Sequence, residues 1–298
     1  MLYEKKSATQ KRQELRGRLA KGDLLQFPGA FNPLSARLIE KQDFDGVYIS
    51  GAVMSAELGL PDIGLTTLSE VRSRAEQISR MTKLPTLVDA DTGFGEAMNL
   101  ARAVQELEAA GVSAIHIEDQ VNPKRCGHLD GKAVVDQSTA IQRITAAANA
   151  RIDESMIIMA RTDMRATDGL DAAIERMRAL EEAGADLLFP EALTSLEEYR
   201  IVKSATKVPI LANMTEFGKT ELFTKAQLAE VGVSIIIYPV SLLRSAMGAA
   251  EKTLAAIKRY GTQTSEVEKM QTRAELYELL DYSSYEGFDK KVFNQGLT

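Results

Sequence analysis

TLVDADTGFG, at residues 86–95, joins a short apolar run to two carboxylates and a glycine-rich turn. Seven further apolar runs flank it, and most are separated by stretches in which apolar residues recur with helical spacing. Such alternation is typical of βαβ units, so we expect a parallel sheet. The other runs are LLQFPGA (24–30), GVYISG (46–51), AIHIED (114–119), MIIMARTD (156–163), LLFPEA (187–192), PILANMT (209–215) and SIIIYPVS (234–241). Eight strands indicate the α/β class and a closed (β/α)8 TIM barrel.

Two of the connecting segments carry the signals of outer barrel helices. In residues 66–83, Thr67 with Glu70 three positions later predicts a capping box, in which side chains satisfy free N–H groups of the first turn. In residues 168–186, apolar residues share one face and Gly184 follows the last turn. We therefore expect both segments to form ordinary helices around the strands.

Composition favours one soluble globular domain over residues 1–298. The chain is 45% hydrophobic and has no Pro- or Gly-rich linker, and single-domain barrels commonly reach about 250 residues. A net charge of −6 argues against a broad nucleic-acid or membrane surface. The charged N-terminus lacks a signal-peptide core, no segment has the length of a membrane span, and a single cysteine suits a reducing compartment. We expect a cytoplasmic protein.

Nearly all of the runs are apolar until their last positions and then end in polar or charged residues. In a barrel these carboxyl ends of the strands converge on one face, where barrel enzymes build their active sites. The residues are Ser50, Asp89, Asp91, Glu118, Asp119, Arg161, Asp163, Glu191, Asn213 and Thr215. Any one of them could simply cap the helix that follows, but capping does not account for the whole set.

Asp89 and Asp91 predict a divalent-cation site. They stand two positions apart, so in an extended strand their side chains point to the same side and reach one ion. Carboxylates suit Mg2+, which usually takes one or two of them and completes its shell with water and substrate. Glu118, at the end of the next run, could add a contact through a bound water. An isolated Asp-x-Asp is more often a turn or a cap, so this inference depends on the strand end and the glycines that follow.

The connection after residue 119 contains KRCGHLDGK, residues 124–132, whose two glycines permit unusual backbone angles and predict a mobile lid. Cys126 lies there among cations that favour its thiolate, so it is a candidate proton donor or nucleophile. A soft metal site of Cys126 and His128 is a weaker interpretation, since the other histidine of the chain is His116. His116 is equally a structural or a catalytic residue of the barrel interior.

Arg161, Arg244 and the backbone amides around Ser50 and Gly51 are what a small polyanionic substrate requires. Guanidinium groups bind carboxylates through two parallel hydrogen bonds, and amide N–H groups add to them. Most surface arginines are simply solvated, but Arg161 directly follows the apolar residues MIIMA, where burying an unneeded charge is costly. The expected partner is therefore a small molecule with several carboxylates.

From about residue 29 to about residue 285 the chain resembles the isocitrate lyase and phosphoenolpyruvate mutase superfamily, and within it the 2-methylisocitrate lyase family. The loop motif KRCGH is highly specific, whereas the aspartate pair alone would not be. The shared motifs are SGAVMSAELGLPDIG (50–64), LVDADTGFG (87–95), HIEDQVNPKRCGHLDGK (116–132), MARTD (159–163), LFPEA (188–192), ILANMTEFG (210–218) and MQTRAELYE (270–278). The resemblance implies Mg2+-dependent retro-aldol cleavage of 2-methylisocitrate, a tricarboxylate, to pyruvate and succinate in propionate catabolism by the methylcitrate cycle.

The resemblance also assigns roles to single residues. The implied metal-binding residues are Asp89 and Asp91, with Asp62 and Glu118 nearby. The implied catalytic residues are Cys126 as the acid, Tyr48 as a candidate base, Arg125 and His128. The implied substrate contacts are Ser50, Gly51, Ala52, Lys124, Gly127, Arg161, Glu191, Asn213, Met214, Thr215, Arg244 and Arg273.

One departure lies after Ser50, where the family often has a run of glycines and this chain has Gly51, Ala52 and Val53. This difference leaves open only how closely the loop after Ser50 fits its ligand. Family members assemble as tetramers and swap a C-terminal helix between paired barrels. The resemblance therefore implies a homotetramer in which residues 261–298 form a helical exchange arm.

The nearest alternative is isocitrate lyase, which would give glyoxylate and succinate with the same machinery. Its members are generally longer and usually carry lysine where Arg125 stands. Phosphonopyruvate-type enzymes and oxaloacetate decarboxylases lack the KRCGH loop, and a noncatalytic binding barrel would not need the aspartate pair and Cys126. Phe189 and Ile237, two apolar residues among the charged strand ends, could form a pocket for the methyl group that distinguishes the two lyase substrates.

Overall fold

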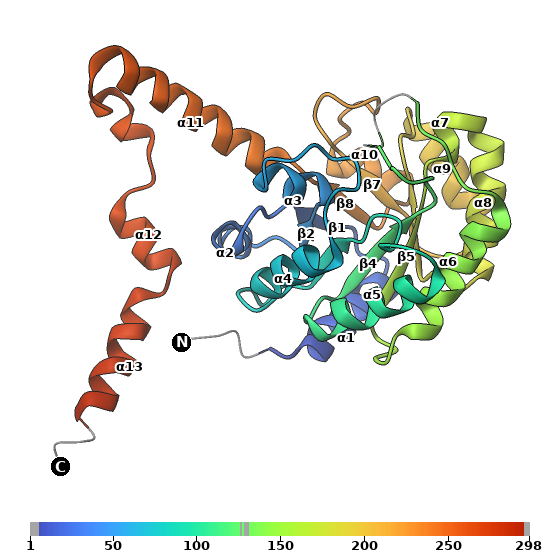
Figure 1. Cartoon of the computed structure of the whole chain (residues 1–298), viewed down its shortest axis with the longest axis horizontal. Helices are drawn as coiled ribbons and strands as arrows, with labels where there is room; N and C mark the ends of the chain where they lie inside the picture. Colours follow the sequence, from blue (N-terminus) through green and yellow to red (C-terminus); the bar gives the residue numbers. More distant parts are fainter. Residues whose placement is uncertain (1–5, 126, 128–130, 295–298) are drawn as a thin grey trace.

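The computed structural model describes residues 6–125, 127 and 131–294. In that part of the chain eight parallel strands surround a common axis, each inside one of the predicted runs (Figure 1). The strands are β1 (Leu25–Pro28), β2 (Val47–Ile49), β3 (Thr86–Asp89), β4 (Ala114–Glu118), β5 (Ile157–Thr162), β6 (Leu187–Pro190), β7 (Leu211–Asn213) and β8 (Ile235–Tyr238). Parallel strands are buried on both faces and so consist of short apolar runs, which is why the sequence located them.

The strands close into the predicted barrel. Strands β2 to β6 form one parallel sheet in chain order, and β1, β8 and β7 form a second. Bridges from Gly29 to Tyr48 and from Leu188 to Ile210 join the two sheets at both seams. Because every pairing is parallel, the carboxyl ends of all the strands face the same side.

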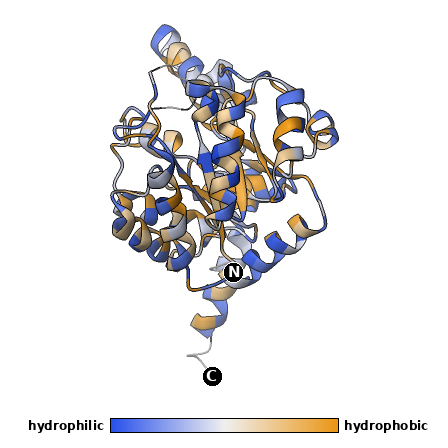
Figure 2. Ribbon diagram, turned by 90° about the vertical axis from the view of Figure 1, so that its right-hand side faces the viewer, coloured by the Kyte–Doolittle hydropathy of each residue, from blue (hydrophilic) through white to orange (hydrophobic). Residues whose placement is uncertain are grey.

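Helices form the outer layer, and Figure 2 shows them alternating between apolar and polar residues around largely apolar strands. Thr67 and Glu70 form the predicted capping box at the start of α4. Gly184 follows α8 with a φ of +107°, a left-handed angle that favours glycine. The helices are α2 (Pro33–Lys41), α3 (Gly51–Glu57), α4 (Leu68–Ser79), α5 (Ala97–Ala109), α6 (Gln137–Ala150), α7 (Met164–Asp168), α8 (Leu170–Glu182), α9 (Leu196–Ala205) and α10 (Lys225–Glu230).

A further helix, α1 (Ala8–Ala20), closes the amino end of the barrel. Its Leu15 is fully buried in the interior cluster, together with Leu25 and Leu87 from the first residues of their strands. Lys11 and Arg12 are buried as well and donate hydrogen bonds to backbone carbonyls. The charged N-terminal stretch is therefore a structural element, which its charge pattern did not predict.

The C-terminal segment extends away from the barrel as α11 (Ser241–Tyr260), the 3-10 helix η1 (Thr264–Lys269), α12 (Arg273–Leu279) and α13 (Tyr282–Asn294) (Figure 1). Apolar side chains along it are open to solvent, including Leu254 at 66% and Phe293 at 74% exposure. Gly261 ends α11 where the predicted exchange arm begins. Exchange between subunits stays a prediction.

Among the described residues, no helix combines the length and apolar content that a membrane span requires.

Candidate active site

The carboxyl ends of the strands bring predicted charged residues together around Arg161, which is buried at the end of β5. Its Nη1 lies 3.1 Å from Glu118 Oε2, and its Nη2 lies 3.3 Å from Glu191 Oε2. Its Nε donates to Asp163 Oδ2 at 3.0 Å. Asn213, at the end of β7, donates from Nδ2 to Glu191 at 3.4 Å. One guanidinium thus joins the ends of β4, β5 and β6, and Glu191 extends the cluster to Asn213 of β7.

Acidic groups outnumber the cation in this cluster. Burial raises the pKa of Glu118 well above its usual value, although the charge of Arg161 opposes the shift. Burial lowers the pKa of Arg161, but Asp163, Glu118 and Glu191 outweigh it and leave that pKa above its usual value. Glu118 Oε1 is buried and has no hydrogen-bond partner among the described residues. A buried acceptor of this kind indicates that a donor, such as bound water, belongs beside it.

Asp89 is the last residue of β3, and Asp91 follows it in a turn with a left-handed angle, so the pair does not lie on one extended strand as predicted. The turn nevertheless brings the two carboxylates together. The Gly51 N–H donates to Asp89 Oδ2 at 3.1 Å, and the Asp91 N–H donates to Asp89 Oδ1 at 3.0 Å. Asp91 Oδ1 lies 2.7 Å from Lys124 Nζ, which also donates to Asp62. Asp91 has a φ of +47°, a strained angle for a residue other than glycine, and such strain is concentrated at functional sites.

The space beside Gly51 tests whether this pair fits a metal ion. A Cβ at Gly51 would lie 2.8 Å from Asp89 Oδ2 and 3.2 Å from Asp91 Oδ1, so both carboxylates face the same small volume. No group of three or more His, Cys, Asp or Glu side chains forms a metal site in the described part of the chain. Two carboxylates are nevertheless a usual protein share for Mg2+, because water and substrate supply the rest. The residues therefore fit this ion.

Electrostatics also favour a cation at the pair. Burial raises the pKa of Asp89, but His116, which is protonated at the low pH where Asp89 titrates, acts with Lys124 and Arg161 to lower that pKa to about 2. Burial and the neighbouring Asp89 raise the pKa of Asp91 to about 6. The two carboxylates thus repel each other in a buried setting. A divalent cation between them would remove that repulsion.

Tyr48 and His116 form a hydrogen-bonded pair in the barrel interior below the acids. Tyr48 Oη lies 2.8 Å from His116 Nε2, and that nitrogen lies 3.6 Å from Asp89 Oδ1. Burial raises the pKa of Tyr48 well above its usual value and lowers the pKa of His116 to about 4. Both side chains are therefore neutral near neutral pH, and Tyr48 is placed to donate a hydrogen bond.

Lys124, Arg125 and Gly127 of the KRCGH motif are described, and they lie at the same end of the barrel. Cys126 and His128, two of the predicted catalytic residues, lie outside the described residues. Arg125 is held by Gln120, whose Oε1 accepts from the Arg125 N–H at 2.9 Å and whose Nε2 donates to its carbonyl at 2.8 Å. A Cβ on Gly127 would lie 2.5 Å from both Arg161 Nη2 and Glu191 Oε2. The backbone of Gly127 therefore lies directly on the charged cluster.

Four other predicted substrate contacts lie at the same end of the barrel. Ser50 is buried and precedes α3, and Ala52 is half-buried in the first turn of that helix. Met214 and Thr215 are buried directly after β7. These positions agree with a site formed by the loops that follow β2 and β7.

Two predicted arginines lie apart from the cluster. Arg244, on α11, is exposed and pairs with Glu216 at 2.9 Å, and its guanidinium lies 5.3 Å from the centre of the Phe217 ring. Arg273 is exposed at the start of α12, in the segment that leaves the barrel (Figure 1). A single chain therefore does not bring Arg273 to the strand ends.

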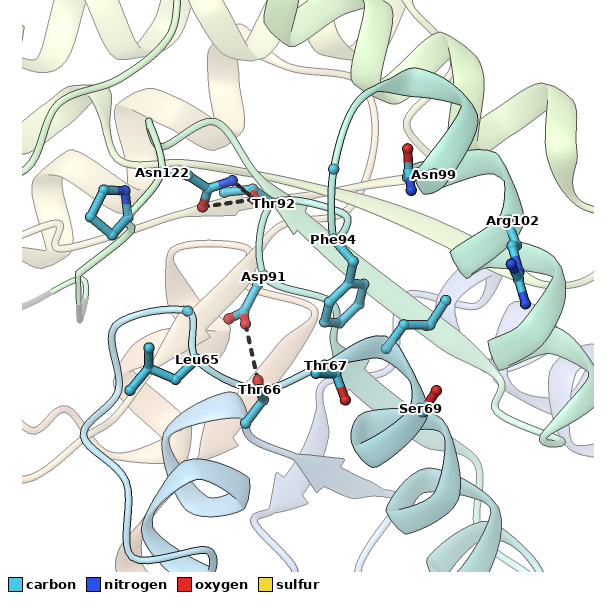
Figure 3. A pocket seen from close by; sticks show the side chains of 14 residues that line it. Leu65, Thr66, Thr67, Ser69, Asp91, Thr92, Phe94, Asn99, Arg102 and Asn122 are labelled. Atoms are coloured by element: carbon cyan, nitrogen blue, oxygen red, sulfur yellow. Dashed lines mark hydrogen bonds between the residues drawn. The ribbon is translucent and has the colours of Figure 1, made fainter.

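A cavity of about 820 Å³ lies beside Asp91 (Figure 3). Asp91 points toward Thr66, with Oδ2 3.5 Å from Thr66 Oγ1, and Phe94, Asn99 and Arg102 line the opposite wall. The cavity lies between the segment before α4 and the turn before α5. It gives the aspartate pair open space on one side.

Reasoning from the sequence missed Arg176, which holds the cluster in place from outside the barrel through Asp119, one of the predicted strand-end residues. Asp119 accepts from Thr162 Oγ1 at 2.7 Å and from the Asp163 N–H at 3.0 Å. Arg176 Nη1 donates to Asp119 at 2.8 Å from the buried face of α8. A charged residue on an apolar helix face was the available signal. Its partner, 57 positions earlier, could not be read from the pattern.

Comparison with known proteins places this site in a family. The phosphoenolpyruvate phosphomutase family matches residues 15–258. The chain is 55% identical over 285 residues to a probable 2-methylisocitrate lyase 2 of Corynebacterium glutamicum, covering 96% of this chain and 93% of that protein. It is 48% identical over 278 residues to a 2-methylisocitrate lyase of Aeropyrum pernix, covering 93% and 90%.

Solved structures agree with the sequence relatives. A crystal structure of 2,3-dimethylmalate lyase is 36% identical with a TM-score of 0.87, covering 96% of this chain and 95% of that one. A complex of phosphonopyruvate hydrolase with oxalate and Mg2+ is 31% identical with a TM-score of 0.85, covering 94% and 98%. The chain therefore belongs to the phosphoenolpyruvate phosphomutase family, within the isocitrate lyase and phosphoenolpyruvate mutase superfamily.

Proposed function

We propose that this chain is a 2-methylisocitrate lyase, a carbon–carbon lyase that releases pyruvate and succinate. The observation that carries the proposal is the buried carboxylate pair of Asp89 and Asp91 beside the Arg161 cluster. Relatives that carry this activity in their names match nearly the whole chain at 48% to 55% identity. We further propose a cytoplasmic role in propionate catabolism through the methylcitrate cycle.

Asp89 and Asp91 would bind Mg2+ directly. Asp62 and Glu118 would lie outside these direct ligands. The ion, when bound, supplies positive charge to the hydroxyl and carboxylate oxygens of the pyruvate half of the substrate. The fit of the aspartate pair beside Gly51 supports this assignment, and a structural relative forms a complex with oxalate and Mg2+.

The protein groups perform the remaining steps of a retro-aldol cleavage. Loss of the proton from the tertiary hydroxyl lets the carbon–carbon bond break, so that pyruvate forms and succinate departs as an enediolate. Cys126 would then protonate the carbanion-like carbon of the succinate enediolate. Arg125 and His128 belong to the same loop. Tyr48 remains the candidate base, although its raised pKa suits it better to donating a hydrogen bond to the developing oxyanion.

Positive groups and backbone amides would bind the carboxylates of the substrate. Arg161 is the central one, because it is buried and preorganised by three acids. The other proposed contacts are Ser50, Gly51, Ala52, Lys124, Gly127, Glu191, Asn213, Met214, Thr215, Arg244 and Arg273. Arg273 would reach a site only from a partner subunit, so its role rests on the proposed homotetramer with exchanged arms at residues 261–298.

The test is to supply purified protein and Mg2+ with 2-methylisocitrate, isocitrate and 2,3-dimethylmalate separately and to identify the products. Pyruvate and succinate from 2-methylisocitrate, at the highest kcat/KM of the three, are the expected result. Glyoxylate from isocitrate at a higher kcat/KM would identify an isocitrate lyase instead. Turnover of none of them would favour a noncatalytic barrel.

A further inference from the structure

We propose that Lys132 is a positioning residue for the lyase reaction, fastening the KRCGH loop to the Arg161 cluster through Asp163 and the Gly127 carbonyl. This inference rests on the proposed function only in treating that cluster as the substrate-binding site. Lys132 closes the loop motif, 31 positions before Asp163 in the chain. Neither residue is among the substrate or metal contacts proposed above.

The side chain of Lys132 is deeply buried although it belongs to a polar loop. Its side chain is 2% exposed, and its Nζ lies 2.7 Å from Asp163 Oδ1, a carboxylate with no exposed surface. The same Nζ donates to the carbonyl of Gly127. Burying a lysine is costly unless its charge and its N–H groups are matched. The two contacts provide that match, so the ammonium group has a defined place.

Asp163 is a firm anchor because several elements fix it. It accepts from Arg161 Nε at 3.0 Å and Nη2 at 3.3 Å, and its N–H donates to Asp119 at 3.0 Å. Asp119 in turn pairs with Arg176 of α8. Lys132 therefore ties the loop to β5 and α8, both parts of the rigid barrel.

The second contact of Lys132 fixes the loop where it touches the cluster. Gly127 lies so close to Arg161 and Glu191 that a Cβ would overlap both side chains. Its carbonyl is the group that Lys132 holds, and the next residue back in the chain is Cys126. Lys132 thus fixes the position of Gly127, the residue next to the proposed catalytic acid Cys126.

Lys132 also changes the charge around Arg161. Asp163 occupies one edge of that guanidinium and would repel an incoming substrate carboxylate. An ammonium 2.7 Å from Asp163 offsets this negative charge when the loop is in place. Loop position and the affinity of Arg161 for a carboxylate are therefore coupled through one ion pair.

The loop has an independent base, so removing Lys132 should not unfold it. Gln120 and Val134 form an antiparallel bridge, and the Val121 N–H donates to the Ala133 carbonyl at 2.8 Å. Arg143 donates to the Gln120 carbonyl at 2.9 Å. These contacts stay intact in a Lys132 variant, which confines the expected change to the loop interior.

The test compares Lys132→Met and Lys132→Arg with Lys203→Met as a matched control. Lys203 also donates to a carbonyl five positions away, at 3.1 Å from Val208, but on α9 and outside the site. For Lys132→Met we expect kcat to fall on the order of 10²-fold, as misplacement of catalytic groups can cause, with a much smaller change in KM. Lys132→Arg should recover part of the loss, and Lys203→Met should retain wild-type kcat.

A second readout needs no substrate. Because the chain has a single cysteine, the rate of alkylation by iodoacetamide reports on Cys126 alone. We expect this rate to change in Lys132→Met at an unchanged thermal midpoint, to change less in Lys132→Arg, which keeps the charge, and not to change in Lys203→Met. Should Lys132→Met fail to fold, Lys132→Gln takes its place in both measurements.

The two readouts separate failure of this inference from failure of the proposed function. An unchanged alkylation rate together with kcat near wild type overturns the role of Lys132. A changed alkylation rate in a protein that cleaves none of the three substrates leaves the loop contact standing and overturns the lyase proposal. Equal loss of kcat in Lys132→Met and Lys203→Met would show a general structural effect and also overturn the role.

Discussion

The two ends of the barrel both bury charged side chains but satisfy them differently. At the amino end, Lys11 of α1 donates to the Ser79 carbonyl at 2.8 Å, and Arg12 donates to the Val112 carbonyl at 2.9 Å and the Glu108 carbonyl at 2.6 Å. Arg12 also pairs with Asp153 at 2.8 Å. Lys11 meets neutral carbonyls, and Arg12 meets carbonyls and two acids, Asp153 and, at 4.0 Å, Glu108. The arrangement is complete without a ligand.

At the carboxyl end the charges are left out of balance. The buried acids are Asp89, Asp91, Glu118, Asp119, Asp163 and Glu191. The cations that meet them among the described residues are Lys124, Lys132, Arg161 and Arg176. Excess buried negative charge destabilises a folded protein unless a cation binds it. The amino end therefore contributes stability, whereas the carboxyl end gives up stability to bind charged ligands.

The largest expected effect tests the carboxyl end through Asp89→Ala. Without this carboxylate the metal site loses one of its two acids, so lyase activity should fall below detection and Mg2+ should not restore it. Chelation should likewise abolish wild-type activity, and Mg2+ should restore it. Thermal unfolding should confirm that the variant is still folded, because the Gly51 and Asp91 N–H groups lose their acceptor. Full wild-type activity in excess EDTA would contradict the metal assignment.

Cys126→Ser has the next largest expected effect. A hydroxyl is a far weaker acid than a thiol, so kcat should fall on the order of 10² to 10⁴. Substrate affinity, measured by calorimetry with the inactive variant, should change little because the replacement is similar in size. Near-normal turnover would remove Cys126 from the role of catalytic acid.

Arg12→Met tests the amino end, where a substitution should lower stability and leave activity unchanged. Two carbonyls and Asp153 lose a charged donor, so the free energy of unfolding should fall by ~2–4 kcal/mol. The kcat of the folded enzyme should stay at the wild-type value. Urea denaturation and steady-state kinetics measure the two quantities. A loss of kcat without a loss of stability would end the contrast between the two ends.

The contribution of Arg12 to the free energy of unfolding should also depend on pH. Burial raises the pKa of Asp153, but hydrogen bonds from Ser155 and Arg12 outweigh it and hold that pKa below its usual value. The contribution is therefore complete above the unfolded pKa of about 3.9 and is lost as pH falls toward the folded pKa. The stability difference between wild type and Arg12→Met should shrink below about pH 4. A difference that grows in acid would contradict this assignment.

The smallest expected effect concerns one methyl group of the substrate. Phe189 is 1% exposed and lies under Arg161, whose guanidinium is 5.2 Å from the ring centre. A methyl pocket at this place should favour 2-methylisocitrate over isocitrate by roughly 10- to 200-fold in kcat/KM. Phe189→Trp should lower this ratio, and the ratio is insensitive to any loss of folded protein. Equal losses for both substrates would remove Phe189 from the pocket.

The sequence predicted the barrel because its strands are short, apolar and bounded by polar ends. The convergence of Glu118, Arg161 and Glu191 followed from parallel strands alone, since the ends of such strands share one face. Contacts between distant segments did not follow. The ion pair of Lys132 with Asp163 joins a loop to a strand end, and no periodic pattern specifies which acid a lysine will meet.

The helix α1 shows a second limit of sequence reasoning. Amphipathic helices are recognised by an apolar stripe, but α1 docks mainly through cations that bind carbonyls. Leu15 is buried in the barrel cluster, and the partly buried Leu19 packs against it. A helix that docks through its cations and a helix exposed to solvent therefore have similar patterns of charged residues in the sequence.

The contacts of α1 also have a consequence for the order of events during synthesis. Arg16 of this helix pairs with Asp186 at 3.0 Å, so one of its partners emerges from the ribosome about 170 residues later. At usual translation speeds that interval is on the order of ten seconds. The first helix to be made must therefore wait, exposed to chaperones and proteases, until more than half of the chain exists to receive it.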